Sequence, residues 1–520
     1  MNGSHTPKDF LGGLKENWKN DILSGFSIFL IALPLCIGIA IASGAPATAG
    51  IYAGIIGGIV VSLISGSYVT INGPAAGLIV IVLSSIEKLG GGNNALGFQY
   101  TLAAIVCCGL IQIVMGLIRA GDLASLFPTS VIHGMLAAIG IIIFVKQFHV
   151  LLGVETTKTS VFDLLSDMPY EIIHLNPYVT IIGLVSVAII VGMNYIKNEK
   201  LKKIPAALVV VVVGIILQKI FDFDSGRSYE YFGNTYHLGN DYLVKIPENF
   251  FDGINHPDFS VFYSKEFGIQ VFAITMVASL ESLLTVSAID RLDPYKRESN
   301  MNTELIAKGV GNTVLGLIGG IPIIAEVVRS SANISNGAKT RWSNFFHGIF
   351  LLLFLLILPD LIRMTPITCL SALLMVVGVR LSIPEFKKMY SIGMEKFIIF
   401  LVTIYFTLAD DLLVGVGFGV ATRFIINFLN MYLPKGVAVN DIFVCNLKKI
   451  EFEDEIFIKV IGVAFFTNIL KLKKTLRKLP KGKNVKLDLS EVYYVDSTVL
   501  TNLLDFRERY ESLGGKFALV

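Results

Sequence analysis

Two interrupted apolar stretches decide the fold of this chain: Thr70-Ile-Asn-Gly-Pro-Ala-Ala-Gly-Leu78 and Gly319-Gly-Ile-Pro-Ile-Ile-Ala-Glu-Val-Val-Arg-Ser-Ser-Ala-Asn333. A helix that crosses a membrane needs about 20 mostly apolar residues, and each stretch is too short or too broken for that. Each contains a proline, Pro74 or Pro322, which suits the first turn of a helix because it has no backbone N–H to leave unpaired. We therefore expect each stretch to open a helix part-way across a membrane.

The composition of the 520-residue chain excludes a soluble enzyme, a disordered chain and a coiled coil. Hydrophobic residues make up 53%, charged residues 16%, and the mean hydropathy is +0.68, whereas a soluble protein carries about 25% charged residues. The 43 basic and 40 acidic residues give a net charge of +3, which is too balanced for a nucleic-acid binder. The five cysteines follow no metal-ligand spacing. We interpret the chain as an integral membrane protein with no resident metal or cofactor.

Twelve longer apolar runs surround the two interrupted stretches and predict spanning helices. They lie near residues 22–42, 49–66, 99–118, 129–148, 177–195, 203–221, 268–288, 303–318, 345–364, 366–381, 394–410 and 411–432. The interrupted stretches, near 70–86 and 322–336, bring the number of predicted crossings to fourteen. Because that number is even, both ends of the membrane region, 21–435, lie on the same side.

The distribution of Lys and Arg predicts which side that is, since cytoplasmic connections carry an excess of both. The basic residues of the connections on the N-terminal side are Arg119, Lys197, Lys200, Lys202, Lys203, Arg291, Lys296, Arg297, Lys339, Arg341, Arg380, Lys387 and Lys388. The opposite connections, 149–176 and 222–267, are rich in Asp and Glu. The polar segment 1–20 shows no cleavable signal. We therefore predict a multi-pass cell-membrane protein whose N-terminus and residues after 435 are cytoplasmic.

The two interrupted stretches occupy matching positions, third in each set of seven crossings. Seven is odd, so the second half runs inverted relative to the first. Interrupted helices at corresponding places of inverted halves are typical of a transporter's binding site. The alternative is that each proline only kinks a packed helix.

The residues of the two stretches favour an anion as the ligand. Gly73, Ala75 and Ala76 are small, so a solute can approach the free amides of a helix start, where the helix dipole is positive. Arg329 adds a full positive charge. Glu326, three residues before Arg329, either neutralises it, contacts the substrate, or is favoured in the first helical turn by the dipole alone.

Glu281 is the only charged residue of the run 268–288, and burying a charge in a membrane is costly enough to indicate function. Thr285 lies one turn further on the same helix face. The pair is a candidate site for Na⁺ or for a transferable proton, and the alternative is a structural hydrogen bond. We interpret Glu304 and Lys308 as side chains that snorkel near a membrane end, and the lone His133 and His149 as hydrogen-bonded residues.

The segment after residue 435 alternates predicted strands and helices, which indicates a small parallel α/β domain over 436–520. The strands are expected at 456–461, 485–489 and 516–520, with a basic helix at 466–478 and a second helix from 499. Because the chain stops within a strand-like segment, we expect this domain to be incomplete.

These features together resemble the SulP family of anion transporters. The signatures are Ala32-Leu-Pro34, Gly44-Ala-Pro46, Gly73-Pro-Ala-Ala-Gly77, Val328-Arg-Ser-Ser-Ala-Asn333 and Gly337-Ala-Lys-Thr-Arg341. The tail resembles a STAS domain, whose characteristic Asp-Ser turn is Asp496-Ser497-Thr498 here.

The resemblance implies a helical membrane protein with seven-plus-seven inverted repeats, core and gate subdomains, an elevator-like movement and a homodimer in the lipid membrane. It implies an inorganic anion as substrate, bound around Ala75, Ala76, Ala325 and Arg329. The residues of the two stretches add Gly73, Pro74 and Glu326 as candidate substrate-binding residues. It also assigns Glu281 to coupling with Na⁺ or H⁺, and adds Thr285 to a Na⁺ site in the bicarbonate transporters of the family. By analogy with stand-alone STAS proteins, Ser497 is a candidate phosphorylation site, with helix capping as the alternative.

Two departures from the family pattern bear on the substrate. Many sulfate-type members have Pro-Gln where this chain has Pro34-Leu35, and the position of Glu326 usually holds a small residue. Both departures favour a monovalent anion such as bicarbonate over sulfate. The alternatives are an uncoupled channel or exchanger, a nucleobase carrier, which would not require Arg329, and a sensor or enzyme, for which no catalytic cluster is present.

Overall fold

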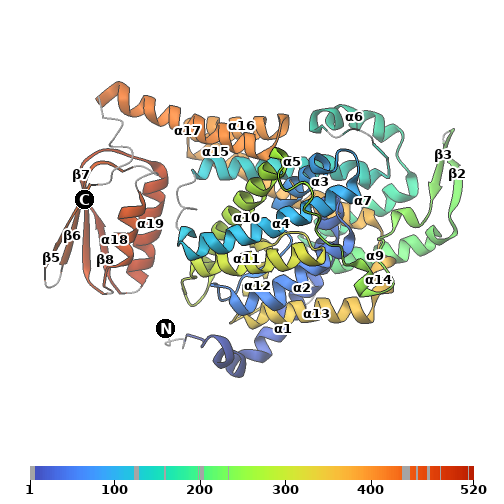
Figure 1. The fold of residues 1–520 in the computed structure, drawn as a ribbon, viewed down its shortest axis with the longest axis horizontal. Coiled ribbons are helices and arrows are strands. Elements are labelled where there is room, and N and C mark those ends of the chain that lie inside the picture. The colour runs from blue at the N-terminus through green and yellow to red at the C-terminus, as the bar shows by residue number, and fades with distance from the viewer. Residues whose placement is uncertain are drawn as a thin grey trace. The chain divides into compact units, whose positions relative to one another are not determined.

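The computed structural model describes residues 6–520 apart from 122–127, 157, 159, 197, 199–203, 232, 436–445, 453–454, 465–468, 481 and 513. It divides into two compact units, residues 1–121 with 136–384 and residues 122–135 with 385–520. The chain is mostly helical, and its strands gather chiefly near the C-terminus (Figure 1). Of the basic residues that predict the orientation, Lys197, Lys200, Lys202 and Lys203 lie outside the described residues.

The first unit consists mainly of helices, and each predicted apolar run that falls in it contains one. These helices are α1 (Phe10–Ala42), α2 (Ala47–Ile64), α3 (Ile79–Gly90), α4 (Asn94–Leu117), α6 (Val161–Ile173), α7 (Pro177–Met193), α9 (Ala206–Ile220), α10 (Lys265–Leu292), α11 (Met301–Ile318), α12 (Val327–Ser335), α13 (Trp342–Ile357) and α14 (Pro359–Arg363). Most of α5 (Thr129–Leu152) and α15 (Ile367–Ile392) belongs to it as well.

Several of the described helices have the length and apolar character of membrane spans. Seven of those described are long and apolar enough to cross a membrane: α1, α2, α4, α5, α10, α15 and α17, the last over Leu412–Asn430. The pair α6 and α7, bent by 112°, makes an eighth, and α9 and α13 are shorter apolar helices. The count of fourteen crossings stays a prediction.

Glycine lets the helices of the first unit approach closely. A Cβ atom at Gly109 of α4 would lie 2.6 Å from the carbonyl oxygen of Gly309 in α11, and one at Gly58 of α2 would lie 2.4 Å from the Cα of Gly348 in α13. Any larger residue at these crossings would push the backbones apart. This is how the high glycine content supports packing between apolar helices.

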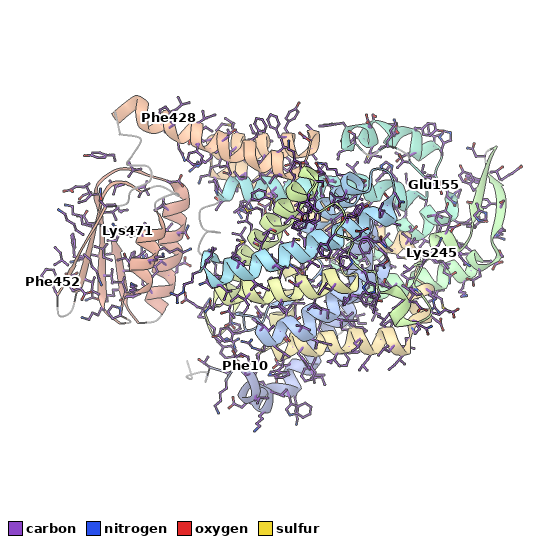
Figure 2. All side chains as sticks on the ribbon, in the orientation of Figure 1. Phe10, Glu155, Lys245, Phe428, Phe452 and Lys471 are labelled. Carbon is purple, nitrogen blue, oxygen red and sulfur yellow. The ribbon has the colours of Figure 1, made fainter. Side chains whose placement is uncertain are left out.

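The two acid-rich connections contain regular secondary structure. Residues 149–176 include α6, and residues 222–267 include a hairpin of β2 (Arg227–Tyr231) and β3 (Asn234–Leu238), which projects beyond the helices of its unit (Figure 1). The rings of Tyr229 and Tyr236 stack across it with centroids 5.6 Å apart. Glu155 and Lys245, labelled in Figure 2, are exposed on these two connections.

The second unit contains two packed helices and an α/β domain. The helices α16 (Met394–Ala409) and α17 (Leu412–Lys435) pack together, with the rings of Phe406 and Phe418 stacked 3.9 Å apart. The domain consists of β5 (Asn446–Glu451), β6 (Glu455–Ala464), α18 (Ile469–Arg477), β7 (Asn484–Val495), α19 (Ser497–Ser512) and β8 (Lys516–Leu519). Phe452, after β5, and Lys471, on α18, are exposed (Figure 2).

The sheet of this domain has the order β5-β6-β7-β8. The pairs β6–β7 and β7–β8 are parallel, as predicted, whereas β5 pairs antiparallel with β6 and was not predicted. Leu472 and Leu476 of α18 and Leu503 of α19 pack into one core with the strands. The alternation of strands and helices therefore predicted the layers correctly and missed only the edge strand.

Candidate functional site

The two interrupted stretches meet as a pair of short antiparallel strands. β1 (Ile71–Gly73) pairs with β4 (Ile324–Glu326), with Asn72 opposite Ala325 and Gly73 opposite Ile324. β1 leads through the 3-10 turn η1 (Ala76–Leu78) into α3, and β4 leads directly into α12. The sequence predicted a helix start in each stretch but not this strand pairing. Strands are recognised in a sequence by the alternation of apolar and polar residues, and three residues are too few to show it.

The two prolines do not occupy the first helical turn, which corrects the expectation from the sequence. Pro74 precedes η1 by two residues, and Pro322 lies five residues before the first residue of α12. Between proline and helix the backbone is extended, with φ −129° and ψ 153° at Ala75 and φ −111° and ψ 124° at Glu326. In the second stretch these extended residues form β4, whose backbone groups pair with β1, as the backbone groups of a buried segment must be paired.

Arg329 of α12 reaches across to the first stretch. Its side chain is buried, with the residue 1% exposed, and its Nη2 donates to the carbonyl oxygen of Pro74 at 3.1 Å. Its Nη1 lies 3.5 Å from Cys36 Sγ of α1, and a Cβ atom at Gly73 would lie 2.8 Å from the same nitrogen. Among the described residues Arg329 forms no ion pair, and its Nε has no hydrogen-bond acceptor. The buried guanidinium thus has an N–H group, at Nε, that is available to donate a hydrogen bond to a ligand.

Glu326 caps the helix that carries Arg329. Its Oε2 accepts from the backbone N–H of Arg329 at 2.6 Å. Within the part of the chain that the structure describes, no ion pair joins the two side chains, so Glu326 caps the helix start and is not paired with the guanidinium. A contact of Glu326 with substrate stays a prediction.

Glu281 of α10 lies against the other stretch. A Cβ atom at Gly77 would lie 2.1 Å from Glu281 Oε2, so the absence of a side chain at Gly77 lets the carboxylate lie directly against η1. Glu281 is buried, and its Oε1 has no hydrogen-bond partner among the described residues. Thr285, one turn on, is also buried. Ser282, which directly follows Glu281 in α10, accepts a hydrogen bond from the backbone N–H of Ala325 at 3.4 Å.

The structure therefore gathers most of the predicted site residues. Gly73, Pro74 and Arg329 are in contact, Ala325 lies in the strand pair, and Glu281 joins them through Gly77. Ala75 and Ala76 are buried between Pro74 and the helix start. Such a place offers amide and guanidinium donors to an anion and a carboxylate oxygen to a cation or proton.

The Asp-Ser turn of the C-terminal domain contacts α17 within the second unit. Asp496 is fully buried, and its Oδ2 accepts from Arg423 Nη2 at 2.6 Å and from Asn427 Nδ2 at 3.1 Å, both on α17. Ser497 is the first residue of α19, and its side chain lies outside the described part of the chain. Its phosphorylation stays a prediction.

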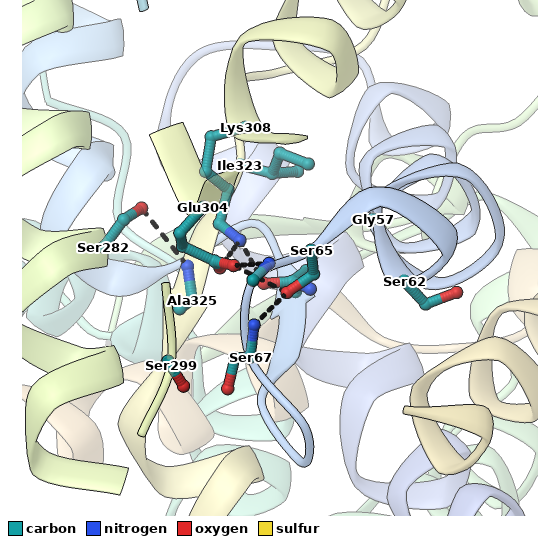
Figure 3. Close-up of polar contacts among 12 residues, drawn as sticks. Gly57, Ser62, Ser65, Ser67, Ser282, Ser299, Glu304, Lys308, Ile323 and Ala325 are labelled. Carbon is teal, nitrogen blue, oxygen red and sulfur yellow. Dashed lines mark hydrogen bonds and ion pairs between the residues drawn. The ribbon is translucent and has the colours of Figure 1, made fainter. Parts of the chain in front are cut away.

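The sequence missed a buried polar network on α11, and the prediction that Glu304 and Lys308 snorkel is wrong. Both are fully buried and form an ion pair (Figure 3). Lys308 Nζ also donates to Asn72 Oδ1 of β1 at 2.5 Å. The signal was present as polar residues spaced by four along an apolar helix. His133 and His149 form ion-pair contacts with Glu385 and Glu171, respectively.

Known proteins match this chain over most of its length. Residues 18–403 match the sulfate permease family, and residues 447–520 match the STAS domain. The bicarbonate transporter BicA of Picosynechococcus sp. is 28% identical over 420 residues, which cover 80% of this chain and 70% of that protein. Sulfate transporter 4.1, chloroplastic, of Arabidopsis thaliana is 23% identical over 534 residues, covering 96% of this chain and 74% of that protein.

Solved structures confirm the expected fold. The transmembrane domain of a cyanobacterium bicarbonate transporter BicA superimposes with a TM-score of 0.66 at 26% identity, covering 80% of this chain and all 100% of that domain. The overall structure of SLC26A9 gives a TM-score of 0.69 at 18% identity, covering 97% of this chain and 84% of that one, and bears on the fold alone. The matched family is made up of membrane transporters and not of enzymes. This chain belongs to the sulfate permease family and carries a STAS domain, and its bicarbonate- and sulfate-transporter relatives support inorganic anion transport as its function.

Proposed function

We propose that this protein is a secondary active transporter that carries bicarbonate, in preference to sulfate, together with Na⁺ or H⁺. The observation that carries this proposal is Arg329, a buried guanidinium outside every ion pair of the described residues, where the two interrupted stretches meet. A buried charge is costly unless a counter-charge accompanies it. A bound anion supplies that counter-charge.

The surroundings of Arg329 fit a small monovalent anion. Its planar guanidinium suits a trigonal oxyanion such as bicarbonate, to which it offers paired N–H donors. The carboxylate of Glu326 lies at the backbone of Arg329 and reduces the positive potential, which disfavours a doubly charged anion. The match with bicarbonate transporter BicA supports the same choice.

Glu281 is the proposed coupling residue. Its Oε1 lacks a hydrogen-bond partner among the described residues, and the carboxylate lies at the start of the α3 segment, close to the proposed anion site. A cation or proton that binds there neutralises the buried carboxylate and favours an anion nearby. For Na⁺, the hydroxyl of Thr285 one turn away is a further oxygen ligand. We also propose an elevator-like movement, a homodimer, and a cytoplasmic N-terminus and STAS domain.

Glu281→Gln tests the coupling. The purified variant in liposomes is expected to lose the stimulation of anion uptake by an inward Na⁺ or H⁺ gradient while keeping its thermal stability, because glutamine has the same shape without the charge. Glu266→Gln is the matched control on α10, since Gln270 Nε2 already donates to the Glu266 carboxylate at 2.6 Å. Gradient-driven uptake that is unchanged in Glu281→Gln would rule out the coupling role.

A further inference from the structure

One face of α11 carries a row of buried polar side chains. Glu304, Lys308 and Asn312 follow one another at intervals of four residues, and each is fully buried. This spacing places the three side chains on the same face of a helix. Buried polar side chains inside an apolar bundle need hydrogen-bond partners within the protein. The partners of these three side chains therefore show which segments α11 holds in place.

The first two members hold the chain between α2 and β1. Glu304 Oε2 accepts from Ser65 Oγ at 2.6 Å and from the backbone N–H of Gly66 at 3.0 Å. Its other oxygen pairs with Lys308, whose Nζ donates to Asn72 Oδ1 at 2.5 Å. Figure 3 shows Glu304, Lys308 and Ser65 converging in this network. β1 is thereby attached to α11.

The third member holds the approach to β4. Asn312 Oδ1 accepts from the backbone N–H of Ile323 at 2.8 Å, and Asn312 Nδ2 donates to Gln112 Oε1 of α4 at 2.8 Å. Ile323 directly precedes β4 (Figure 3). The same face of one helix thus holds both strands that lead to the two helix starts.

Lys308 and Arg329 lie on opposite sides of β1. The Cβ direction of Gly73 points to Arg329 Nη1, and side chains alternate along a strand, so Asn72 points to the other side, where it meets Lys308. The Lys308 charge is already compensated by Glu304. Lys308 therefore does not contact the proposed anion directly.

We infer that Glu304 and Lys308 are positioning residues of the anion site, which act through Asn72 on the geometry of β1. Two strands of three residues do not hold a fixed geometry by their own pairing. The hydrogen bonds from α11 add a constraint to those that Ser330 and Asn344 make with the backbone of β1, and they help to orient the amides that follow Pro74. This inference rests on the proposed anion transport and names the residues that set its affinity.

The test is a double variant, Glu304→Gln with Lys308→Met, assayed as the full chain in liposomes for labelled bicarbonate and labelled sulfate. Removing both charges together leaves no unpaired buried ion, so the variant is expected to fold. KM for the transported anion is expected to rise about tenfold while kcat stays within about threefold, because binding geometry is lost and not the translocation step.

A matched control removes a buried ion pair that touches neither strand. Asp293 and Arg297 are also four residues apart and buried, and Arg297 donates to the carbonyl oxygen of Lys339. Asp293→Asn with Arg297→Met is expected to leave KM within about twofold. An equal rise of KM in the control would overturn the inference, since any lost ion pair would then have the same effect.

Asn72→Ala is the second variant, which leaves the ion pair intact and removes only the acceptor on β1. It is expected to raise KM as the double variant does, and it decides the question if the double variant does not fold. An unchanged KM in Asn72→Ala would overturn the positioning role. Uptake by the unaltered protein is measured beside the variants, so a failure of the proposed transport is recognised separately as an absence of uptake in the wild type.

Discussion

Arg329 of α12 donates a hydrogen bond of 3.1 Å to the carbonyl oxygen of Pro74, although 255 residues separate them in the chain. The contact joins the second interrupted stretch to the first and leaves the Nε of the same guanidinium without an acceptor among the described residues. The Arg329 side chain thus links the two stretches through one hydrogen bond and keeps its Nε–H available as a donor to a ligand.

Arg329→Gln is expected to reduce anion uptake at least about 100-fold, because the loss of a buried charge-assisted contact costs about 3 kcal/mol or more. Arg329→Lys is expected to retain part of the activity, since lysine keeps the charge but not the planar set of donors. Initial rates of labelled anion uptake in liposomes measure both. Full activity in Arg329→Gln would place the anion elsewhere.

Gly77→Ala tests the close contact between the first stretch and the coupling carboxylate. The added methyl group would lie 2.1 Å from Glu281 Oε2, so the carboxylate has to move away. We expect cation-stimulated uptake to fall at least about tenfold, consistent with the cost of overpacking a buried site. Gly268→Ala on α10 is the control, because a methyl group there meets nothing within 4 Å. Equal activities of the two variants would contradict the contact.

Asp496→Ala tests the buried contact between the Asp-Ser turn and α17. Arg423 and Asn427 both lose an acceptor, and breaking one side of a buried ion pair destabilises by about 3–5 kcal/mol. Thermal unfolding of the purified full chain is expected to shift to lower temperature, and Arg423→Met in the same chain is expected to restore part of the loss. An unchanged unfolding temperature in Asp496→Ala would show that this contact contributes little.

The sequence predicted the helical elements, and it singled out the candidate site residues, for physical reasons that can be named. Apolar runs of about 20 residues are a strong signal, and proline with small residues marks a broken span. Pro74, Arg329 and Glu281 stand out because charges and helix breakers are rare in such runs. Their meeting in one place followed from the matching positions of the two stretches.

The strand pair and the α11 network were not predicted, because both depend on partners far away in the chain. Lys308 bonds Asn72 across 236 residues, and Glu304 bonds Ser65 across 239. A lysine four residues after a glutamate looks the same in sequence whether it points to a membrane surface or into the bundle. The spacing of Glu304, Lys308 and Asn312 on one helix face favours the interior, and it is the signal to weigh in similar chains.

Uptake of labelled bicarbonate and labelled sulfate by the purified wild-type protein in liposomes tests coupled anion transport most directly. Each anion is offered without a gradient, under an inward Na⁺ gradient and under an inward proton gradient. We predict that bicarbonate accumulates above its equilibrium level under one of the two gradients and that sulfate accumulates less. Anion uptake that is the same with and without both gradients would contradict coupling and indicate a channel or an exchanger, and uptake of neither anion would contradict the proposed function.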